Sequence, residues 1–186
     1  WQVHSLQRPG DVDRRIENGV LDVVRRAKEE GRVRHVGFTG HRMQQAHAHM
    51  LERTDFFETV QMPINIADPT PENESFTLNV LSEAVDRDMG VLAMKTLSDG
   101  GFFGGRSHSQ SGPHARIIPD RASIQEALHF AWSLPISTLI TGPNNIEQMQ
   151  EKIDLARSFT GMSESEREDL IERAADIAEE VEFYKA

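Results

Sequence analysis

The hydrophobic positions of this chain follow two different spacings that take turns along its length. Short runs in which apolar residues are adjacent or two positions apart are each followed by a longer stretch with apolar residues three or four positions apart. The first spacing is typical of β-strands, and the second is typical of helices that bury one face. The sequence therefore predicts strands and helices in regular alternation.

Five segments of the chain have the strand spacing. They are residues 1–6, 33–39, 59–65, 91–97 and 138–141. The alternation is clearest in the third segment, where Val60, Met62 and Ile64 are separated by less hydrophobic residues. Strands separated by helices at intervals of roughly thirty residues indicate right-handed βαβ units and a parallel sheet.

The intervening segments predict helices over residues 11–31, 42–53 and 75–88, with three more beginning near residues 123, 145 and 163. Each of these last three begins with a capping residue that is followed, three positions later, by an acid or amide side chain. The pairs are Ser123 with Glu126, Asn145 with Gln148, and Ser163 with Glu166. The final helix has a buried stripe of Leu170, Ala174, Ile177 and Val181. Residues 98–122 form a long polar and glycine-rich loop, a length that is usually functional or disordered.

The fold class follows from this alternation. No GxGxxG motif follows the first strand, so the fingerprint of a Rossmann dinucleotide-binding fold is absent. A closed eight-stranded barrel needs about 250 residues, and this chain has 186. We predict an α/β fold of the (β/α)8 TIM-barrel type in which only about the last five βα units are present. Residues 1–186 form one partial barrel domain, with residues 161–186 as an additional C-terminal helix. We expect more sequence upstream, because the chain opens directly in a strand.

Composition and charge exclude several classes of function. The formal net charge of -10 argues against a sequence-independent contact with nucleic acid phosphates. The absence of cysteine excludes thiol catalysis, disulfides and cysteine-ligated zinc within these residues, and it fits a reducing compartment. No apolar run approaches the roughly 20 residues that cross a membrane, and no basic segment marks a signal peptide. We expect a cytoplasmic protein without nucleic acid or membrane partners.

Four stretches resemble parts of one enzyme family. In order, they are WQVHSL, GRVRHVGFTGH, VQMPIN and LITGPNNIEQMQEK. From Trp1 to about Leu155, the chain resembles the C-terminal half of the aldo-keto reductases. The resemblance implies an oxidoreductase that reduces an aldehyde or ketone with NADP as the cofactor, or with NAD as the alternative. All four stretches end at predicted carboxyl ends of parallel strands, where barrel enzymes assemble their sites.

The catalytic tetrad of that family consists of Asp, Tyr, Lys and His. His4 matches the histidine, which the resemblance implies orients or polarises the substrate carbonyl as a neutral imidazole. Its alternative role is that of a hydrogen-bonded histidine at the mouth of the barrel. The other three tetrad residues belong to strands upstream of this chain. Tyr184 lies in the C-terminal tail, so we expect that it is not the proton donor and that the chain alone is inactive.

The resemblance also assigns the nicotinamide end of the cofactor. Thr39 and Gly40 stand where the family usually has Ser-Asn; the Thr39 hydroxyl can bond a carboxamide, whereas Gly40 has no side chain to do so. Gln61 matches the glutamine that contacts the nicotinamide amide, with a polar residue of the barrel interior as its alternative. Asn65 lies on the same side of the strand and is expected beside the substrate. Met94 replaces a stacking tyrosine and covers the ring by dispersion.

The phosphate and adenosine contacts are expected after the last two strands. Lys95 is expected to meet the pyrophosphate or, alternatively, to pair with a surface carboxylate. Glycines of the following loop let backbone N–H groups approach phosphates. The residues expected over the cofactor there are Leu97, Gly100, Gly101, Gly104 and Gly105.

A second set surrounds the start of the helix after the last strand, where N–H groups and the helix dipole favour an anion. This set consists of Gly142, Pro143, Asn144, Gln148 and Lys152. Gln148 stands where relatives often have Arg, and Lys152 where an Asn often contacts adenine, so the preference for NADP is not settled by these positions. The alternative is an ordinary helix cap formed by Asn145 and Gln148.

Three histidines, His41, His47 and His49, lie close enough in the sequence to suggest a metal site. Positions two apart on a helix face different directions, so His47 and His49 cannot chelate one ion together, and with His41 they are expected to be surface residues. We predict no metal site. The alternative to an enzyme is a nicotinamide-nucleotide-binding regulatory or scaffold module without turnover; an unrelated barrel fragment is a weaker one. The expected partners are a small carbonyl substrate and, through open sheet edges, a second copy of the chain.

Overall fold

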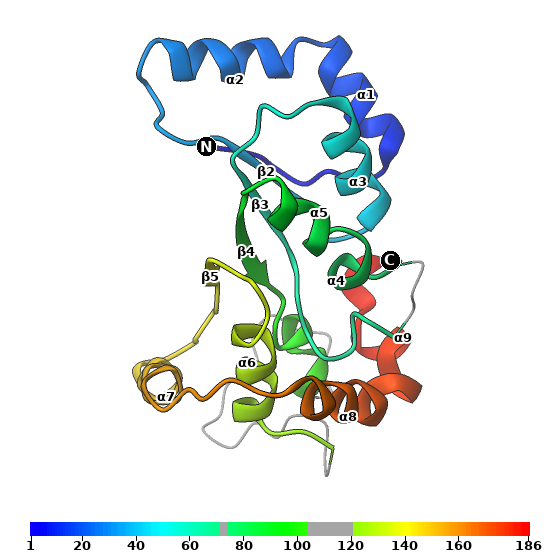
Figure 1. The fold of residues 1–186 in the computed structure, drawn as a ribbon, viewed down its shortest axis with the longest axis vertical. Helices are drawn as coiled ribbons and strands as arrows, with labels where there is room; N and C mark the ends of the chain where they lie inside the picture. The colour runs from blue at the N-terminus through cyan, green and yellow to red at the C-terminus, as the bar shows by residue number, and fades with distance from the viewer. Residues whose placement is uncertain (71–73, 104–120) are drawn as a thin grey trace.

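The computed structural model describes residues 1–70, 74–103 and 121–186. Within them the strands form one five-stranded sheet whose spatial order is the order of the sequence (Figure 1). The strands are β1 (Gln2–Val3), β2 (Gly37–Thr39), β3 (Thr59–Pro63), β4 (Gly90–Met94) and β5 (Thr138–Leu139). Each is shorter than its apolar run, but the prediction of five strands is confirmed.

All four strand pairs are parallel. Phe38 of β2 pairs with Val3 of β1 on one side and with Val60 of β3 on the other, and Val60 pairs in turn with Val91 of β4. A doubly wound sheet reverses its strand order at a switch point, whereas this sheet adds each new strand at the same edge. That progression is the one found in a barrel wall.

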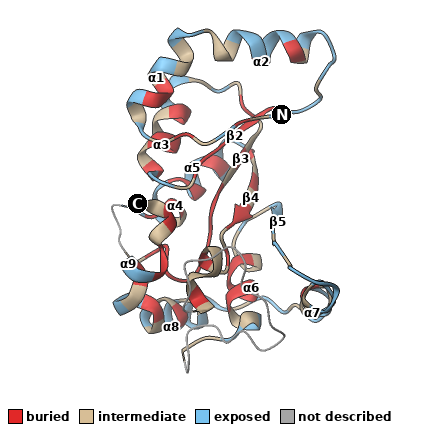
Figure 2. Ribbon diagram, turned by 180° about the vertical axis from the view of Figure 1, so that it is seen from behind, coloured by how far each residue is buried: buried red, intermediate tan, exposed pale blue. Residues whose placement is uncertain are grey.

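The two faces of the sheet have different surroundings. Val60, Met62, Val91 and Ala93 have no exposed surface and belong to the core beneath the helices (Figure 2). These helices include α1 (Pro9–Glu17), α3 (Gln44–Arg53) and α5 (Leu81–Asp86). Side chains alternate between faces along a strand, so Gln61 and Leu92 point the other way, and both are only partly buried. Helices therefore cover the outer face and leave the inner face open.

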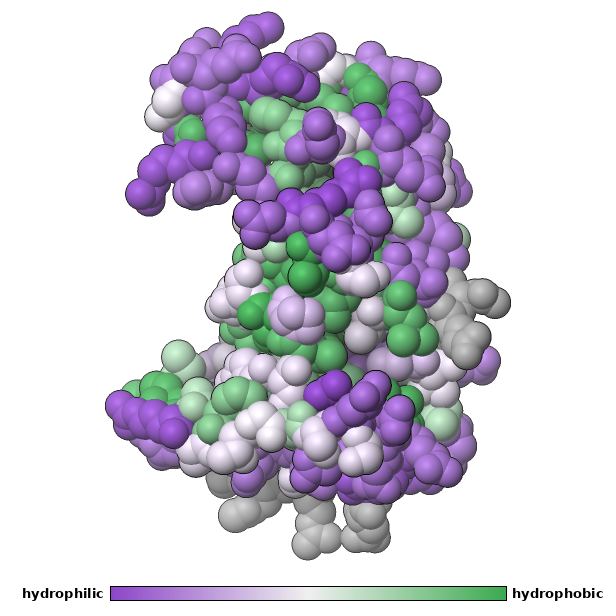
Figure 3. Space-filling model, in the orientation of Figure 1, coloured by the Kyte–Doolittle hydropathy of each residue, from purple (hydrophilic) through white to green (hydrophobic). Residues whose placement is uncertain are grey.

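The open side is visible as a hollow in the surface. Figure 3 shows the molecule hollowed between α2 (Val20–Glu29) and α7 (Ile146–Arg157), with apolar side chains, in green, along the floor. Ile140, directly after β5, is 42% exposed, and Ile146 and Met149 of α7 are 82% and 45% exposed. Among the described residues, no helix is long and apolar enough to cross a membrane.

Two helices that the sequence predicts as continuous are broken. The predicted helix 11–31 is divided into α1 and α2 by Gly19, whose φ of 77° lies in the left-handed region that a right-handed helix does not use. The predicted helix 75–88 is divided into α4 (Phe76–Asn79) and α5 at Val80, whose φ and ψ are -125° and -35°. The buried positions were nevertheless predicted correctly, because Phe76 and Ala84 have no exposed surface.

The C-terminal part begins as predicted and then departs from one helix. Ser123 and Ser163 form complete capping boxes at the starts of α6 (Ile124–Trp132) and α8 (Glu164–Ala174). The last predicted helix continues instead as η3 (Ala175–Ile177), α9 (Ala178–Val181) and η4 (Phe183–Lys185). Its apolar stripe packs as expected in a second core beside α6 and the kinked 3-10 segment η2 (Ser98–Phe103). The remainder of the predicted loop, residues 104–120, lies outside the described residues.

Candidate functional site

Three residues of the predicted nicotinamide contact lie in a row across the sheet. Thr39 of β2 pairs with Gln61 of β3. The Gln61 amide nitrogen donates to the Met94 sulfur of β4 at 3.2 Å. These side chains therefore lie together near the carboxyl edge of β2, β3 and β4, and Gln61 points to the open inner face.

His4 follows β1 at the same edge and is exposed. Its backbone oxygen accepts a hydrogen bond from Arg15 of α1 at 2.9 Å, which fastens the chain at this point. His41, after β2, is partly buried, and burial together with the charge of Lys95 lowers the pKa of its imidazole. Burial therefore favours the neutral form of the His41 imidazole at this edge.

Packing explains the missing side chain at Gly40. A Cβ at Gly40 would lie 2.5 Å from the Leu6 backbone oxygen and 2.8 Å from the His47 ring. His47 is fully buried, and its ring packs edge-on against Phe38 and Phe76 at 5.2 and 5.0 Å. The expectation of a surface histidine was wrong here, because His47 faces the sheet from α3 and fills space that Gly40 leaves.

The other predicted surface histidine of α3, His49, lies on a different side of the helix. Its ring contacts Asp13 of α1 at 3.0 Å and Glu52 at 3.3 Å. The hydrogen bond to Asp13 raises the pKa of His49. Among the described residues there is no group of three side chains placed to hold a metal ion.

The loop after β4 contacts protein groups at the positions assigned to the cofactor. The Lys95 ammonium lies 2.8 Å from the Asp99 carboxylate, which is the alternative considered for this residue. Leu97 packs against the second core, and the Gly100 N–H donates to the Leu97 oxygen at 3.1 Å. A Cβ at Gly101 would lie 2.4 Å from the Val181 oxygen. Gly104 and Gly105 lie outside the described residues.

Asn65, the predicted substrate contact, joins β3 to the C-terminal tail. Its amide nitrogen donates to the Tyr184 oxygen at 2.9 Å and lies 3.3 Å from both Glu182 Oε1 and the Lys95 oxygen. Its amide oxygen accepts from the backbone N–H groups of Ala67 and Asp68 at 2.8 and 3.1 Å. Asn65 is fully buried, and its contacts with Glu182, Tyr184 and the two backbone N–H groups are shielded from water.

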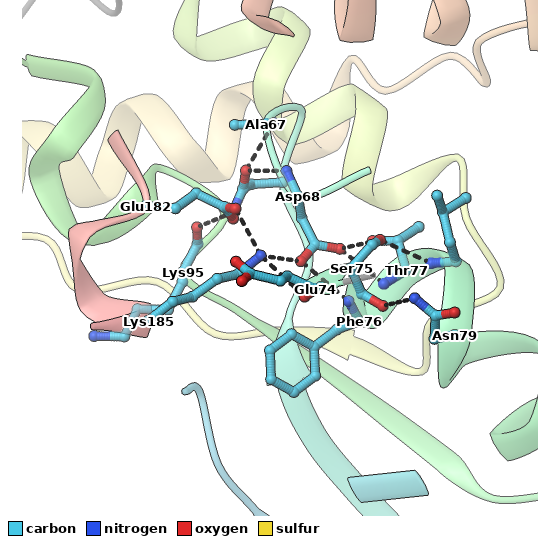
Figure 4. A network of polar contacts seen from close by, with 12 residues as sticks. Ala67, Asp68, Glu74, Ser75, Phe76, Thr77, Asn79, Lys95, Glu182 and Lys185 are labelled. Carbon is cyan, nitrogen blue, oxygen red and sulfur yellow. Dashed lines mark hydrogen bonds and ion pairs between the residues drawn. The ribbon is translucent and has the colours of Figure 1, made fainter. Parts of the chain in front are cut away.

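Beside this amide, Asp68, Glu182 and Lys185 form a buried ionic network. Figure 4 shows these three side chains together. Lys185 Nζ lies 2.9 Å from Asp68 Oδ1 and 2.6 Å from Glu182 Oε2. The Asp68 carboxylate also accepts from the backbone N–H groups of Phe76 and Thr77 at 3.1 and 2.7 Å. Asp68 therefore links the start of α4 to the tail.

Burial shapes the acidity of this network. Burial raises the pKa of Glu182, and the charge of Asp68 raises it further. Burial lowers the pKa of Lys185, but the two neighbouring carboxylates outweigh it and leave that pKa raised. Burial and the nearby carboxylates hold the pKa of Tyr184 well above its ordinary value.

Tyr184 of the C-terminal tail lies near the strand ends, because the tail folds back over β3 and β4. Its ring lies 6.2 Å from the His41 ring, and the Lys95 ammonium lies 5.7 Å from its centre. The hydroxyl donates to Glu182 at 2.6 Å, so it does not point to an open ligand position. A buried phenol with a raised pKa and a carboxylate acceptor is poorly suited to donating a proton to a substrate.

The start of α7 combines a helix cap with an open turn. Asn145 Oδ1 accepts from the Gln148 N–H at 2.8 Å, and Gln148 Oε1 accepts from the Asn144 N–H at 2.7 Å. No atom lies within 4 Å of a Cβ placed at Gly142. Lys152 is largely buried, burial lowers its pKa, and its nitrogen lies 3.5 Å from the Gln148 oxygen.

The predicted residues thus form two groups on neighbouring strands. The first gathers at the carboxyl ends of β1 to β4, and the second follows β5 at the start of α7. Sequence reasoning missed Asp68, Glu182 and Lys185, and the separation of 117 positions between Asp68 and Lys185 explains why. A lone Asp and a short polar tail show no spacing that would reveal their contact.

No known family profile matches the sequence, and no curated protein matches it either. Solved structures do match. Aldo-keto reductase AKR11C1 from Bacillus halodurans, in its holo form, is similar with a TM-score of 0.65 and 18% identity over 92% of this chain and 57% of its own. The thermostable aldo-keto reductase Tm1743, in complex with the inhibitor epalrestat, has a TM-score of 0.54 and 15% identity over 92% of this chain and 69% of its own.

Glycerol dehydrogenase AKR11B4 from Gluconobacter oxydans is similar with a TM-score of 0.52 and 14% identity over 91% of this chain and 65% of its own. At such identities the likeness shows the fold alone. The prediction of a partial aldo-keto reductase-like barrel is therefore confirmed as a fold. The chain spans 57% of the length of the first of these structures.

Proposed function

We propose that this chain is the nucleotide-binding part of an NAD(P)H-dependent oxidoreductase of the aldo-keto reductase type, which reduces an aldehyde or ketone to an alcohol. The observation that carries the proposal is the row formed by Thr39, Gln61 and Met94 at the carboxyl edge of a sheet with this fold. The resemblance of the sequence assigns the nicotinamide to the same three side chains.

The chemistry of Gln61 fits a nicotinamide carboxamide. Its side chain supplies both a donor and an acceptor and faces the open side of the sheet. The donor is directed at the sulfur of Met94, which is a weak acceptor. A carbonyl oxygen in place of the sulfur would accept a stronger hydrogen bond from Gln61, so binding a carboxamide is favourable for this side chain.

The start of α7 fits the phosphate end of a nucleotide. The helix has 12 residues, and its dipole directs partial positive charge toward Gly142 and Asn144. The ammonium of Lys152, within the same helix, lies 3.5 Å from the Gln148 oxygen, and the charge of Glu151 does not outweigh its burial. A phosphate near this ammonium would offset the burial that lowers its pKa. This charge favours NADP, with NAD as the alternative.

The chain's own residues bind and orient in this proposal. The nucleotide, when bound, supplies a hydride. His4 is exposed at the end of β1, where its imidazole can orient the carbonyl oxygen of a small substrate. Reduction to an alcohol also needs a proton, and Tyr184 directs its hydroxyl to Glu182 instead of to this edge. We therefore propose that the proton donor lies in strands outside this chain and that the chain alone has no turnover.

A second candidate is a nucleotide-binding regulatory or scaffold module. The closed packing around Gly40 favours it, because a side chain that would contact the nicotinamide in a reductase has no room there. Asp, Tyr and Lys residues in upstream strands would favour the enzyme, and their absence there would favour the module.

Nucleotide binding can be measured by the fluorescence of NADPH and NADH on titration with the 186-residue chain. We expect NADPH to bind and Gln61→Leu to weaken it by about tenfold, the effect of losing about 1.4 kcal/mol of hydrogen bonding. Gln150→Leu is the matched control, because Gln150 is an exposed amide on α7 between the predicted contacts Gln148 and Lys152. Equal affinities for the wild type and the Gln61 variant would reject the assigned site.

A further inference from the structure

The last residues of the tail lie across the carboxyl ends of β3 and β4. The Ser98 hydroxyl donates to the Val181 oxygen at 2.5 Å, and Gly101 leaves room for the same oxygen. Asn65 holds Tyr184, and Asp68 holds Lys185. Residues 181–185 are therefore attached along their length to the segments that follow these two strands.

Much of this attachment is polar and ionic. Asp68 has no exposed surface, Glu182 is 5% exposed, and the Lys185 side chain is 8% exposed. The cost of removing such groups from water offsets much of their mutual attraction, so a buried network of this kind is specific but adds little net stability. Removing one charge, by contrast, leaves its partners buried without compensation. The attachment is thus sensitive to the loss of a single member.

The closed tail occupies the hydrogen-bonding groups of Asn65 that a ligand at this edge would contact. The Asn65 amide nitrogen has two hydrogens and faces three oxygens, those of Tyr184, Glu182 and Lys95. No donor of Asn65 remains for a substrate oxygen. The Tyr184 ring stands beside His41 and within 5.7 Å of the Lys95 ammonium. A substrate can reach Asn65 only after the tail has moved.

We propose that residues 181–185 are a releasable latch, which Asp68 holds closed through Lys185 and which must open before a ligand contacts Asn65. The proposal rests on the proposed function only in taking this edge as the ligand site. The latch itself is a property of the chain without any ligand, so it can be tested separately from nucleotide binding.

Tyr184 reports the state of the latch, because it is the only tyrosine in a chain without cysteine. Tetranitromethane nitrates exposed tyrosines, and the absence of thiols removes its main competing reaction. In the wild-type chain we expect nitration to be at least roughly tenfold slower than in urea, where the phenol is exposed. Lys185→Met, which removes the ammonium, should raise the native rate by roughly tenfold or more. Circular dichroism of each variant verifies that it remains folded.

Arg157→Met is the control, because Arg157 pairs with Asp154 on the exposed surface of α7, and it should leave the rate unchanged. If Lys185→Met does not fold, Ser98→Ala replaces it, since the Ser98 contact with Val181 holds the same segment without a charge. Nitration of the wild type as fast as in urea would overturn the latch, and so would an unchanged rate in a folded variant. Failure of NADPH to bind would contradict the proposed function and leave the nitration result standing.

Discussion

The side-chain amide of Asn65 donates a hydrogen bond of 2.9 Å to the hydroxyl oxygen of Tyr184, 119 positions away in the sequence. The contact joins the carboxyl end of β3 to the tail and is buried. It brings the only tyrosine of the chain to the edge where the sequence predicts a substrate, and it occupies the residue assigned to that substrate.

Asn65→Ala should destabilise the chain by about 2–3 kcal/mol, because the Tyr184 hydroxyl and the backbone N–H of Ala67 lose a buried partner. Urea unfolding followed by circular dichroism measures the change in the free energy of unfolding. Asn18→Ala provides the control, since Asn18 is exposed at the end of α1. Equal losses for the two variants would contradict the role of Asn65 in holding the tail.

Gly40→Ala should destabilise the chain by about 1–3 kcal/mol, the usual cost of forcing a methyl group into a filled site. The added Cβ would lie 2.5 Å from the Leu6 oxygen and 2.8 Å from the His47 ring, so both the Leu6 backbone and this ring must shift. Gly10→Ala is the matched comparison, because no atom lies within 4 Å of its Cβ position in α1 and alanine favours a helix. We expect Gly10→Ala to be neutral or stabilising in the same unfolding assay, and a neutral Gly40→Ala would show that the site is not filled.

The burial of His47 predicts a stability that depends on pH. Burial lowers the pKa of His47 from 6.5 to about 4 in the folded chain. Below pH 6.5 the unfolded chain binds a proton that the folded chain does not, so this contribution is present above pH 6.5 and is lost as the pH falls toward 4. The loss amounts to about 3 kcal/mol.

Urea unfolding at several pH values tests this slope by comparing variants. His47→Leu should flatten the profile between pH 6.5 and 4, whereas His35→Leu should not, because the His35 side chain is 72% exposed. Identical profiles for the wild type and His47→Leu would mean that the imidazole is not held neutral by burial.

The open inner face predicts that the chain associates with itself. β1 and β5 are the edge strands of the described sheet, and Ile140 beside β5 is 42% exposed. Sedimentation velocity should detect dimers or larger species, and Ile140→Glu should reduce them by placing a charge on this face. Val23→Glu, at a 59% exposed position of α2, should have no such effect. A sharp monomer peak with cooperative unfolding of the wild type would contradict this prediction.

The apolar pattern was sufficient to predict the sheet. Side chains two positions apart on a strand, such as Val60 and Met62, lie on the same face, so the burial of that face is visible in the sequence itself. The cap residues Ser123 and Ser163 were equally predictable, since each forms its capping box with a glutamate only three positions later. The break at Gly19 was missed because an isolated glycine inside a helical pattern does not show whether its φ is positive.

The site was predictable only in part. Gln61 and Thr39 were found because strand ends in parallel sheets share an edge and the resemblance supplied their roles. The fate of Asn65 and Tyr184 depends on how the tail folds back, which is a contact between distant segments with no periodic signal. The ion pair of Lys95 with Asp99 was likewise not predictable. It depends on the backbone path of the loop, in which Lys95, Ser98 and Asp99 have positive φ.

The central claim is that a nicotinamide nucleotide binds over Gln61 and Met94. Methyl-labelled methionine gives one NMR signal for each of the seven methionines, and Met94→Leu identifies the signal of Met94. On addition of NADP, we expect the Met94 methyl signal to shift strongly because a ring lies over it, while that of Met43, 43% exposed before α3, stays in place. An unmoved Met94 signal at saturating nucleotide would contradict the proposed site.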